Sequence, residues 1–156
     1  TKNINNRITS RYGCLAVFKK SASAHSTASK IYRLTLERRL GADGQIQELE
    51  LVGEVDFTTI SSDTFSGSLP TAFDFSRDGS RFLVLTYVNA FEFYINLSDQ
   101  RLPATADLVA VAHFREIPLE MLLQQESIAY LGESAFIYTT EALDGTARIM
   151  RVRCRQ

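Results

Sequence analysis

One turn-and-strand phrase occurs twice in the chain and restricts the folds that the surrounding sequence can adopt. Residues 76–86 begin with a polar turn around Gly79 and continue as an apolar stretch that ends in threonine. Residues 131–140 have the same form, with Gly132 in the turn. Glycine supplies the positive φ that tight hairpin turns need, so each phrase predicts a β-hairpin. A recurring unit of this kind favours a fold built from stacked sheets.

Strand-length segments with apolar and polar alternation fill most of the remaining chain. Turn residues separate these segments, and they group into three units. The strands that we expect are 12–18, 31–38 and 46–56; then 72–76, 81–87, 90–95 and 108–114; then 128–130, 135–140 and 147–153. The small, polar stretch 21–29 predicts a surface loop, and Pro118–Gln125 is the one helical candidate, of one turn or two.

This pattern predicts an all-β fold of antiparallel, four-stranded β-propeller blades. We expect one domain over residues 1–156, with about three blade-like units near residues 11–56, 71–116 and 125–154. A β-sandwich with two similar hairpins is the alternative. Because closed propellers use about four to eight blades, three units predict an incomplete ring, either a half-propeller or one that two associated copies would close.

The aromatic strand around Phe91 and Phe93 has two interpretations. It is able to present an aromatic binding surface, or to bury its rings between blades. Alternation places Phe91 and Phe93 on the same face of the strand, which favours packing between blades.

Composition excludes several classes of partner. Hydrophobic residues make up 45% and charged residues 22% of the 156 positions, which is typical of a globular protein with a core. Seventeen basic residues stand against eighteen acidic ones, so no positive excess exists to bind a nucleic acid backbone. The apolar runs have the length of strands and predict no membrane span.

The chain contains two cysteines, Cys14 and Cys154, near its two ends. They are interpreted either as independent, half-buried thiols or as a disulfide that joins the first strand to the last in an oxidising compartment. Their separation excludes a C-x-x-C metal or redox motif.

Residues 71–81, Thr-Ala-Phe-Asp-Phe-Ser-Arg-Asp-Gly-Ser-Arg, resemble a turn found in bacterial β-propellers. There an inner strand ends in Asp-x-Ser-Pro-Asp-Gly, and Arg77 stands here in place of the proline. The segments that follow are similar to a group of secreted bacterial propellers, itself loosely related to phytase-like and esterase-like propellers. These segments are 85–91, 125–130 and 139–141.

The resemblance extends over residues 71–153, while residues 12–56 share only the strand pattern. Leu85 departs from the group, whose members often have arginine before the Thr-Tyr pair. The group has no defined activity, so the resemblance implies a fold resembling a C-terminal half-propeller and a secreted or periplasmic location rather than a reaction.

Three carboxylates at strand ends are the candidate site residues: Asp74, Glu126 and Glu141. If the inner strands line a central channel, these side chains would converge there and hold a hard cation such as calcium through oxygen ligands. The phytase-like relationship would then imply calcium and a phosphate ester. The alternative is structural, since an aspartate on an inner strand commonly accepts backbone hydrogen bonds within the sheet.

Motifs for other chemistry are missing from the sequence. It has no Gly-x-Ser-x-Gly elbow for a hydrolase nucleophile and no Gly-x-x-x-x-Gly-Lys loop for phosphate. We therefore expect a non-enzymatic binding or scaffold module without a cofactor, whose partner is an undefined ligand or protein. A calcium-dependent, phytase-like or esterase-like hydrolase is the alternative, and a structural segment of a larger propeller is a third possibility.

Overall fold

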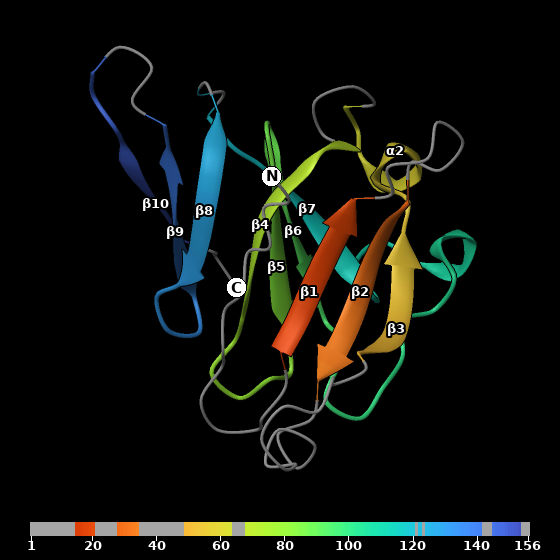
Figure 1. Cartoon of the computed structure of the whole chain (residues 1–156). Coiled ribbons are helices and arrows are strands. Elements are labelled where there is room, and N and C mark those ends of the chain that lie inside the picture. The colour runs from red at the N-terminus through yellow and green to blue at the C-terminus, as the bar shows by residue number, and fades with distance from the viewer. Residues whose placement is uncertain are drawn as a thin grey trace, which may run out of the picture.

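The computed structural model describes residues 15–20, 28–34, 49–63, 68–120, 122, 124–141 and 145–153. Its described strands form three antiparallel sheets, which confirms the all-β prediction. The first sheet has the order β1-β2-β3, the central sheet β4-β5-β6-β7 and the third sheet β8-β9-β10. In Figure 1 the first sheet lies in front of the central sheet, and the third sheet stands to its left.

Each sheet is a meander in which consecutive strands pair. The strands are β1 (Leu15–Lys20), β2 (Ser29–Leu34) and β3 (Glu50–Val55); β4 (Pro70–Phe75), β5 (Phe82–Thr86), β6 (Asn89–Phe93) and β7 (Phe114–Pro118); β8 (Gln125–Tyr130), β9 (Ala135–Thr140) and β10 (Ile149–Arg153). The turn between β4 and β5 contains Gly79, whose φ of 74° is the left-handed conformation that the sequence predicted there.

The central sheet is buried on both faces, and strand β5 shows why. Phe82 and Val84 point into one apolar cluster, while Leu83 and Leu85 point into another. The first cluster joins the central sheet to the first sheet through residues such as Ile31. The second cluster joins it to the third sheet. Continuous burial along β5 follows from these two contacts, because alternate side chains of a strand face opposite sides.

The aromatic residues predicted as core occupy the cluster between the first and central sheets. Phe91 and Phe93 are both fully buried, as expected from their alternation. The ring of Phe93 stacks on that of Phe82, with centroids 4.6 Å apart, and meets Phe57 edge-on at 6.4 Å. These contacts make this side of the central sheet an aromatic core.

The connection between β6 and β7 reaches across to the first sheet. The amide of Leu102 donates to the carbonyl of Val52 in β3 at 2.9 Å, and the Arg33 guanidinium donates to the carbonyl of Leu97 at 2.9 Å. Leu102 passes so close to Gly53 that a Cβ atom at Gly53 would overlap the Leu102 side chain. The first sheet is therefore attached to the central sheet by backbone contacts as well as by apolar packing.

The prediction of a helix at Pro118–Gln125 is wrong. Pro118 ends β7, Gln125 begins β8, and no described residue between them is helical. Leu119 and Leu122 pack instead against the apolar cluster between the central and third sheets, and Gln124 has a positive φ of 50°. The partial burial of Leu119 and Leu122 outweighs their helix propensity.

Short helical segments occur elsewhere in the described chain, among them α2 (Phe57–Ile60) and η2 (Thr105–Asp107). The helix α2 is capped by Asp56, whose carboxylate accepts a hydrogen bond from the Thr58 amide at 3.0 Å. The 3₁₀ helix η2 lies in the connection between β6 and β7.

Two boundaries predicted from the sequence are also corrected. The fourth strand of the central sheet was expected at 108–114, whereas β7 begins at Phe114. Val111 has a φ of 72°, and the amide of His113 donates to the carbonyl of Val109, so this stretch is a turn. Ser29, placed in the surface loop by its composition, instead begins β2 and is 2% exposed.

Some predictions fall outside the described residues. Cys14, Cys154 and residues 21–27 belong to this group, so the disulfide and the loop stay predictions. In the part of the chain that the structure describes, no helix is long and apolar enough to cross a membrane.

Candidate functional site

A row of side chains, polar at three of its four positions, crosses the face of the central sheet that meets the third sheet. Asp74, Leu83, Glu92 and Arg115 are successive register partners across β4, β5, β6 and β7. Directly opposed residues in antiparallel strands point to the same face, so these side chains lie in one line. We call Asp74, Arg81, Glu92, Arg115 and Tyr130 the polar cluster.

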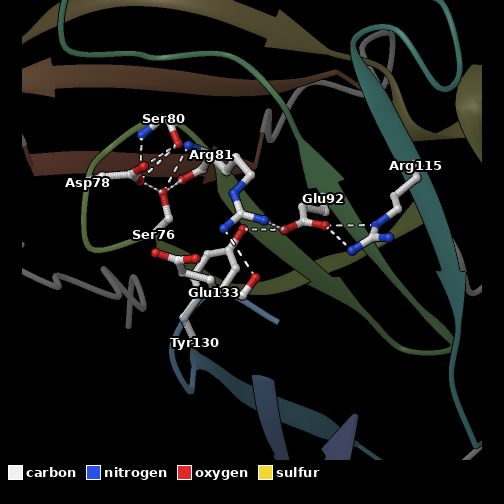
Figure 2. A network of polar contacts seen from close by, with 8 residues as sticks. All are labelled: Ser76, Asp78, Ser80, Arg81, Glu92, Arg115, Tyr130 and Glu133. Carbon is white, nitrogen blue, oxygen red and sulfur yellow. Dashed lines mark hydrogen bonds and ion pairs between the residues drawn. The ribbon is translucent and has the colours of Figure 1, made fainter. Parts of the chain in front are cut away.

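Glu92 is the centre of the polar cluster and is 1% exposed. Its carboxylate accepts a hydrogen bond from Arg115 Nε at 2.7 Å and one from Arg81 Nη1 at 3.1 Å. Figure 2 shows the carboxylate held between the two guanidinium groups. A buried carboxylate is tolerated when it is paired and hydrogen-bonded in this way.

Tyr130, at the end of β8, connects the polar cluster to the third sheet. Its hydroxyl donates to Glu92 at 3.1 Å, and its ring lies 5.7 Å from the Arg81 guanidinium carbon. Burial, followed by the negative charge of Glu92, raises the pKa of the Tyr130 hydroxyl above its usual value. The hydroxyl therefore remains protonated and acts as a hydrogen-bond donor, not as a base.

Asp74, a candidate from the sequence, belongs to the same contact between sheets. It is 8% exposed, and its carboxylate accepts a hydrogen bond from the backbone amide of Tyr130 at 2.9 Å. Arg81 adds a third connection by donating to the carbonyl of Glu133 at 3.2 Å. Asp74 thus connects the central sheet to the third sheet through a backbone hydrogen bond.

The other two candidates lie at the opposite end of the third sheet. Glu126 is half-buried in β8, four positions before Tyr130, which is a separation of about 13 Å along a strand. Glu141 is exposed where β9 ends, and its amide donates to the carbonyl of Gln124 at 2.9 Å. The structure therefore brings Glu126 and Glu141 to one end of the third sheet, whereas Asp74 of the central sheet contacts the other end through Tyr130.

Metal binding would need several ligands at one place. Within the described ranges, no group of three or more His, Cys, Asp or Glu side chains is arranged to hold a metal ion. The carboxylates of the polar cluster, Asp74 and Glu92, accept hydrogen bonds from protein groups. The calcium alternative therefore remains a prediction to be tested by experiment.

The turn that resembles the propeller phrase is stabilised by Asp78. Its carboxylate accepts hydrogen bonds from the Ser76 hydroxyl at 2.7 Å, the Ser80 hydroxyl at 2.8 Å and the Ser80 amide at 3.1 Å. These bonds, with that of Ser76 the largest contribution, lower the pKa of Asp78 to about 2. Arg81 follows Asp78 by three residues, and the turn positions its guanidinium over the ring of Tyr130 (Figure 2).

Sequence reasoning did not find the centre of the polar cluster. Glu92 stands between Phe91 and Phe93, and its one signal was a charged residue within a run of apolar strand residues. Its partners Arg81 and Arg115 are 11 and 23 positions away in the sequence. Their approach depends on strand register, which becomes visible only when the sheet is known.

Comparison with known proteins adds no relative to this description. A scan against protein-family models and searches of curated proteins and of solved structures gave no match. The resemblance of residues 71–153 to a group of bacterial propellers therefore stays a prediction.

Proposed function

We propose that the chain is a three-sheet segment of a β-propeller that serves as a non-enzymatic binding or scaffold module, secreted or periplasmic. The observation that carries this proposal is the double burial of the central sheet. In a two-layer sandwich each sheet buries one face, whereas a propeller blade buries both faces against its neighbours. Leu83 and Val84, adjacent in β5, are both fully buried in different apolar clusters, as expected for a blade.

The contact between β4 and β8 also supports a blade arrangement. These are the first strands of the central and third sheets, and they lie next to each other in space. In a propeller the first strand of each blade lies toward the central axis, so first strands of successive blades are neighbours. The bond from the Tyr130 amide to Asp74 connects these two strands directly.

The chemistry of the polar cluster favours a scaffold over an enzyme. Its two carboxylates and two guanidinium groups balance in charge, and Tyr130 is held in its protonated form. Such a network fixes the orientation of two sheets, because a displaced sheet would leave buried charges without partners. It offers no activated nucleophile or base.

Calcium titration separates the scaffold from the hydrolase alternative. We expect the thermal midpoint of the chain to be the same in calcium and in a chelator. The variants Asp74→Asn and Glu126→Gln remove charge while keeping side-chain size, and Asp99→Asn, an exposed aspartate, is the control. A midpoint that rises with calcium in the wild type and the control but in neither test variant would overturn the scaffold proposal.

Self-association is tested by light scattering coupled to size exclusion. The outer sides of the first and third sheets carry exposed apolar residues, including Leu51 and Ile149. A ring of blades would cover both sides. A particle of twice the chain mass would support closure by two copies, whereas a monomer at all concentrations would contradict it.

A further inference from the structure

The third sheet has one strand fewer than the central sheet in the described chain. β8 lies against β4, so β9 corresponds to β5 and β10 to β6 in the order of strands. On the far side of β6 the central sheet continues with β7, but among the described strands β10 pairs with β9 alone. In Figure 1, β10 forms the outer side of the third sheet. An edge strand of this kind presents backbone donors and acceptors to an added strand.

Side chains on β10 alternate between charge and apolar character. Arg151 and Arg153 are exposed, whereas Met150 and Val152 pack against the apolar cluster between the central and third sheets. No described residue forms an ion pair with either arginine. On its outward face the strand thus presents two arginines, separated by one residue, whose charges no described residue pairs.

The corresponding edge in the central sheet shows which chemistry suits this position. There Glu92 of β6 is directly opposite Arg115 of β7, and the two form an ion pair. Opposite charges at such cross-strand positions are favourable and like charges are unfavourable. A strand added beside β10 would therefore be selected for acidic residues opposite Arg151 and Arg153.

The same rule argues against pairing of β10 with a second copy of itself. An antiparallel pair of two β10 edges would bring arginines toward arginines on one face. A partner with alternating acidic and apolar residues avoids this repulsion and also extends the apolar face formed by Met150 and Val152.

We propose that the outer edge of β10, which no described strand covers, binds an extended acidic segment of a partner protein as an added strand of the third sheet. The segment carries Asp or Glu at two positions separated by one apolar residue. Backbone hydrogen bonds hold it, and Arg151 and Arg153 select its charge. This inference rests on the proposed binding role of the chain, but not on closure of a propeller ring.

The test uses the 156-residue chain and fluorescein-labelled eight-residue peptides. One peptide alternates glutamate with valine, and a second replaces each glutamate with lysine. Fluorescence anisotropy should show saturable binding of the glutamate peptide and none of the lysine peptide. Arg151→Glu should weaken binding at least tenfold, and Arg151→Glu with Arg153→Glu should transfer binding to the lysine peptide.

Arg77→Glu is the matched control for charge. Arg77 is exposed in the turn between β4 and β5, and this variant changes net charge by the same amount as Arg151→Glu. Binding to Arg77→Glu should stay within about twofold of the wild type, since Arg77 lies in a turn of the central sheet, outside the third sheet, and an exposed charge is screened by salt. Equal losses in the two variants would mean general electrostatic attraction and would overturn the proposal.

N-methylated peptides test the backbone contacts. Two versions of the glutamate peptide carry N-methyl groups on alternate amides, one on the odd and one on the even positions. Only one version turns blocked amides toward β10, so one should lose binding at least tenfold and the other should keep it. Equal behaviour of the two versions would overturn strand addition.

The absence of any peptide binding would overturn this inference while leaving the scaffold proposal intact. The two arginines would then protect an exposed edge against unwanted strand pairing. A calcium response that depends on Asp74 and Glu126 would instead overturn the proposed function, whatever the peptide does.

Discussion

The two faces of the central sheet are both buried, but by different means. Toward the first sheet the contact is made largely by aromatic rings, with Phe82 stacked on Phe93. Toward the third sheet the contact combines apolar side chains with the polar cluster, which is centred on the buried carboxylate of Glu92. Aromatic packing contributes stability over a large area, whereas hydrogen-bonded charges tolerate little displacement. We infer that the first interface supplies most of the stability and the second fixes the relative position of two sheets.

Truncation in the aromatic interface should have the largest effect. Phe93→Ala removes a fully buried ring and leaves a cavity between the sheets, at a cost of about 4 kcal/mol in the free energy of unfolding. Urea denaturation measures this loss. Val109→Ala, at a side chain that is 55% exposed, is the control and should change stability by about 0.5 kcal/mol or less. A loss below about 1 kcal/mol for Phe93→Ala would contradict the assignment of stability to this interface.

Neutralising the buried carboxylate should have the next largest effect. Glu92→Gln leaves Arg81 and Arg115 without their charged partner, and we expect a loss of about 2 kcal/mol, reduced by the partial exposure of both arginines. The control is Glu54→Gln, because Glu54 pairs with Lys30 at the surface, where an ion pair contributes about 0.5 kcal/mol. If Glu92→Gln and Glu54→Gln lower the free energy of unfolding equally in the same urea experiment, the buried ion pairs of Glu92 contribute no more than a surface ion pair.

These effects also show which parts of the structure were accessible from the sequence. The alternation of Phe91 and Phe93 and the glycine turn at Gly79 are local signals, and both were predicted correctly. The boundary of β7 was not, because it depends on the positive φ of Val111, a residue type that rarely adopts it.

The site was less accessible than the fold. The sequence selected Asp74, but its partner is the backbone amide of Tyr130, 56 positions later. Every residue except proline has a backbone amide, so the identity of residue 130 does not indicate that it binds Asp74. Glu126 and Glu141 were grouped with Asp74 by their place at strand ends, yet strand direction places them at the other end of the third sheet.

Removal of one hydroxyl from the polar cluster should have a smaller effect. Tyr130→Phe deletes the donor to Glu92 but keeps the backbone bond to Asp74, and we expect a loss of about 1 kcal/mol. Chemical denaturation of the single variants and of Tyr130→Phe with Glu92→Gln gives a double-mutant cycle. The losses should be less than additive, and strict additivity would show that the two groups do not interact.

The smallest effect concerns the turn at Asp78. Its pKa is lowered from 3.8 to about 2 on folding, so its contribution is present above pH 4 and is lost as the pH falls toward 2. Because Asp78 is exposed, we expect about 0.5 kcal/mol or less. The difference in stability between wild type and Asp78→Asn should narrow between pH 5 and pH 2. A difference that is constant over this range would contradict the assigned pKa.

The position of β5 has a consequence for motion within the molecule. β5 has a paired strand on each side and an apolar layer on each face, so its amides exchange with solvent only when its hydrogen bonds to β4 and β6 break, which also disrupts both apolar clusters. A fluctuation that detaches either the first or the third sheet from the central sheet leaves β5 covered on its other face. Deuterium should therefore enter β5 last, at a rate set by disruption of the whole stack rather than by fraying of any single strand.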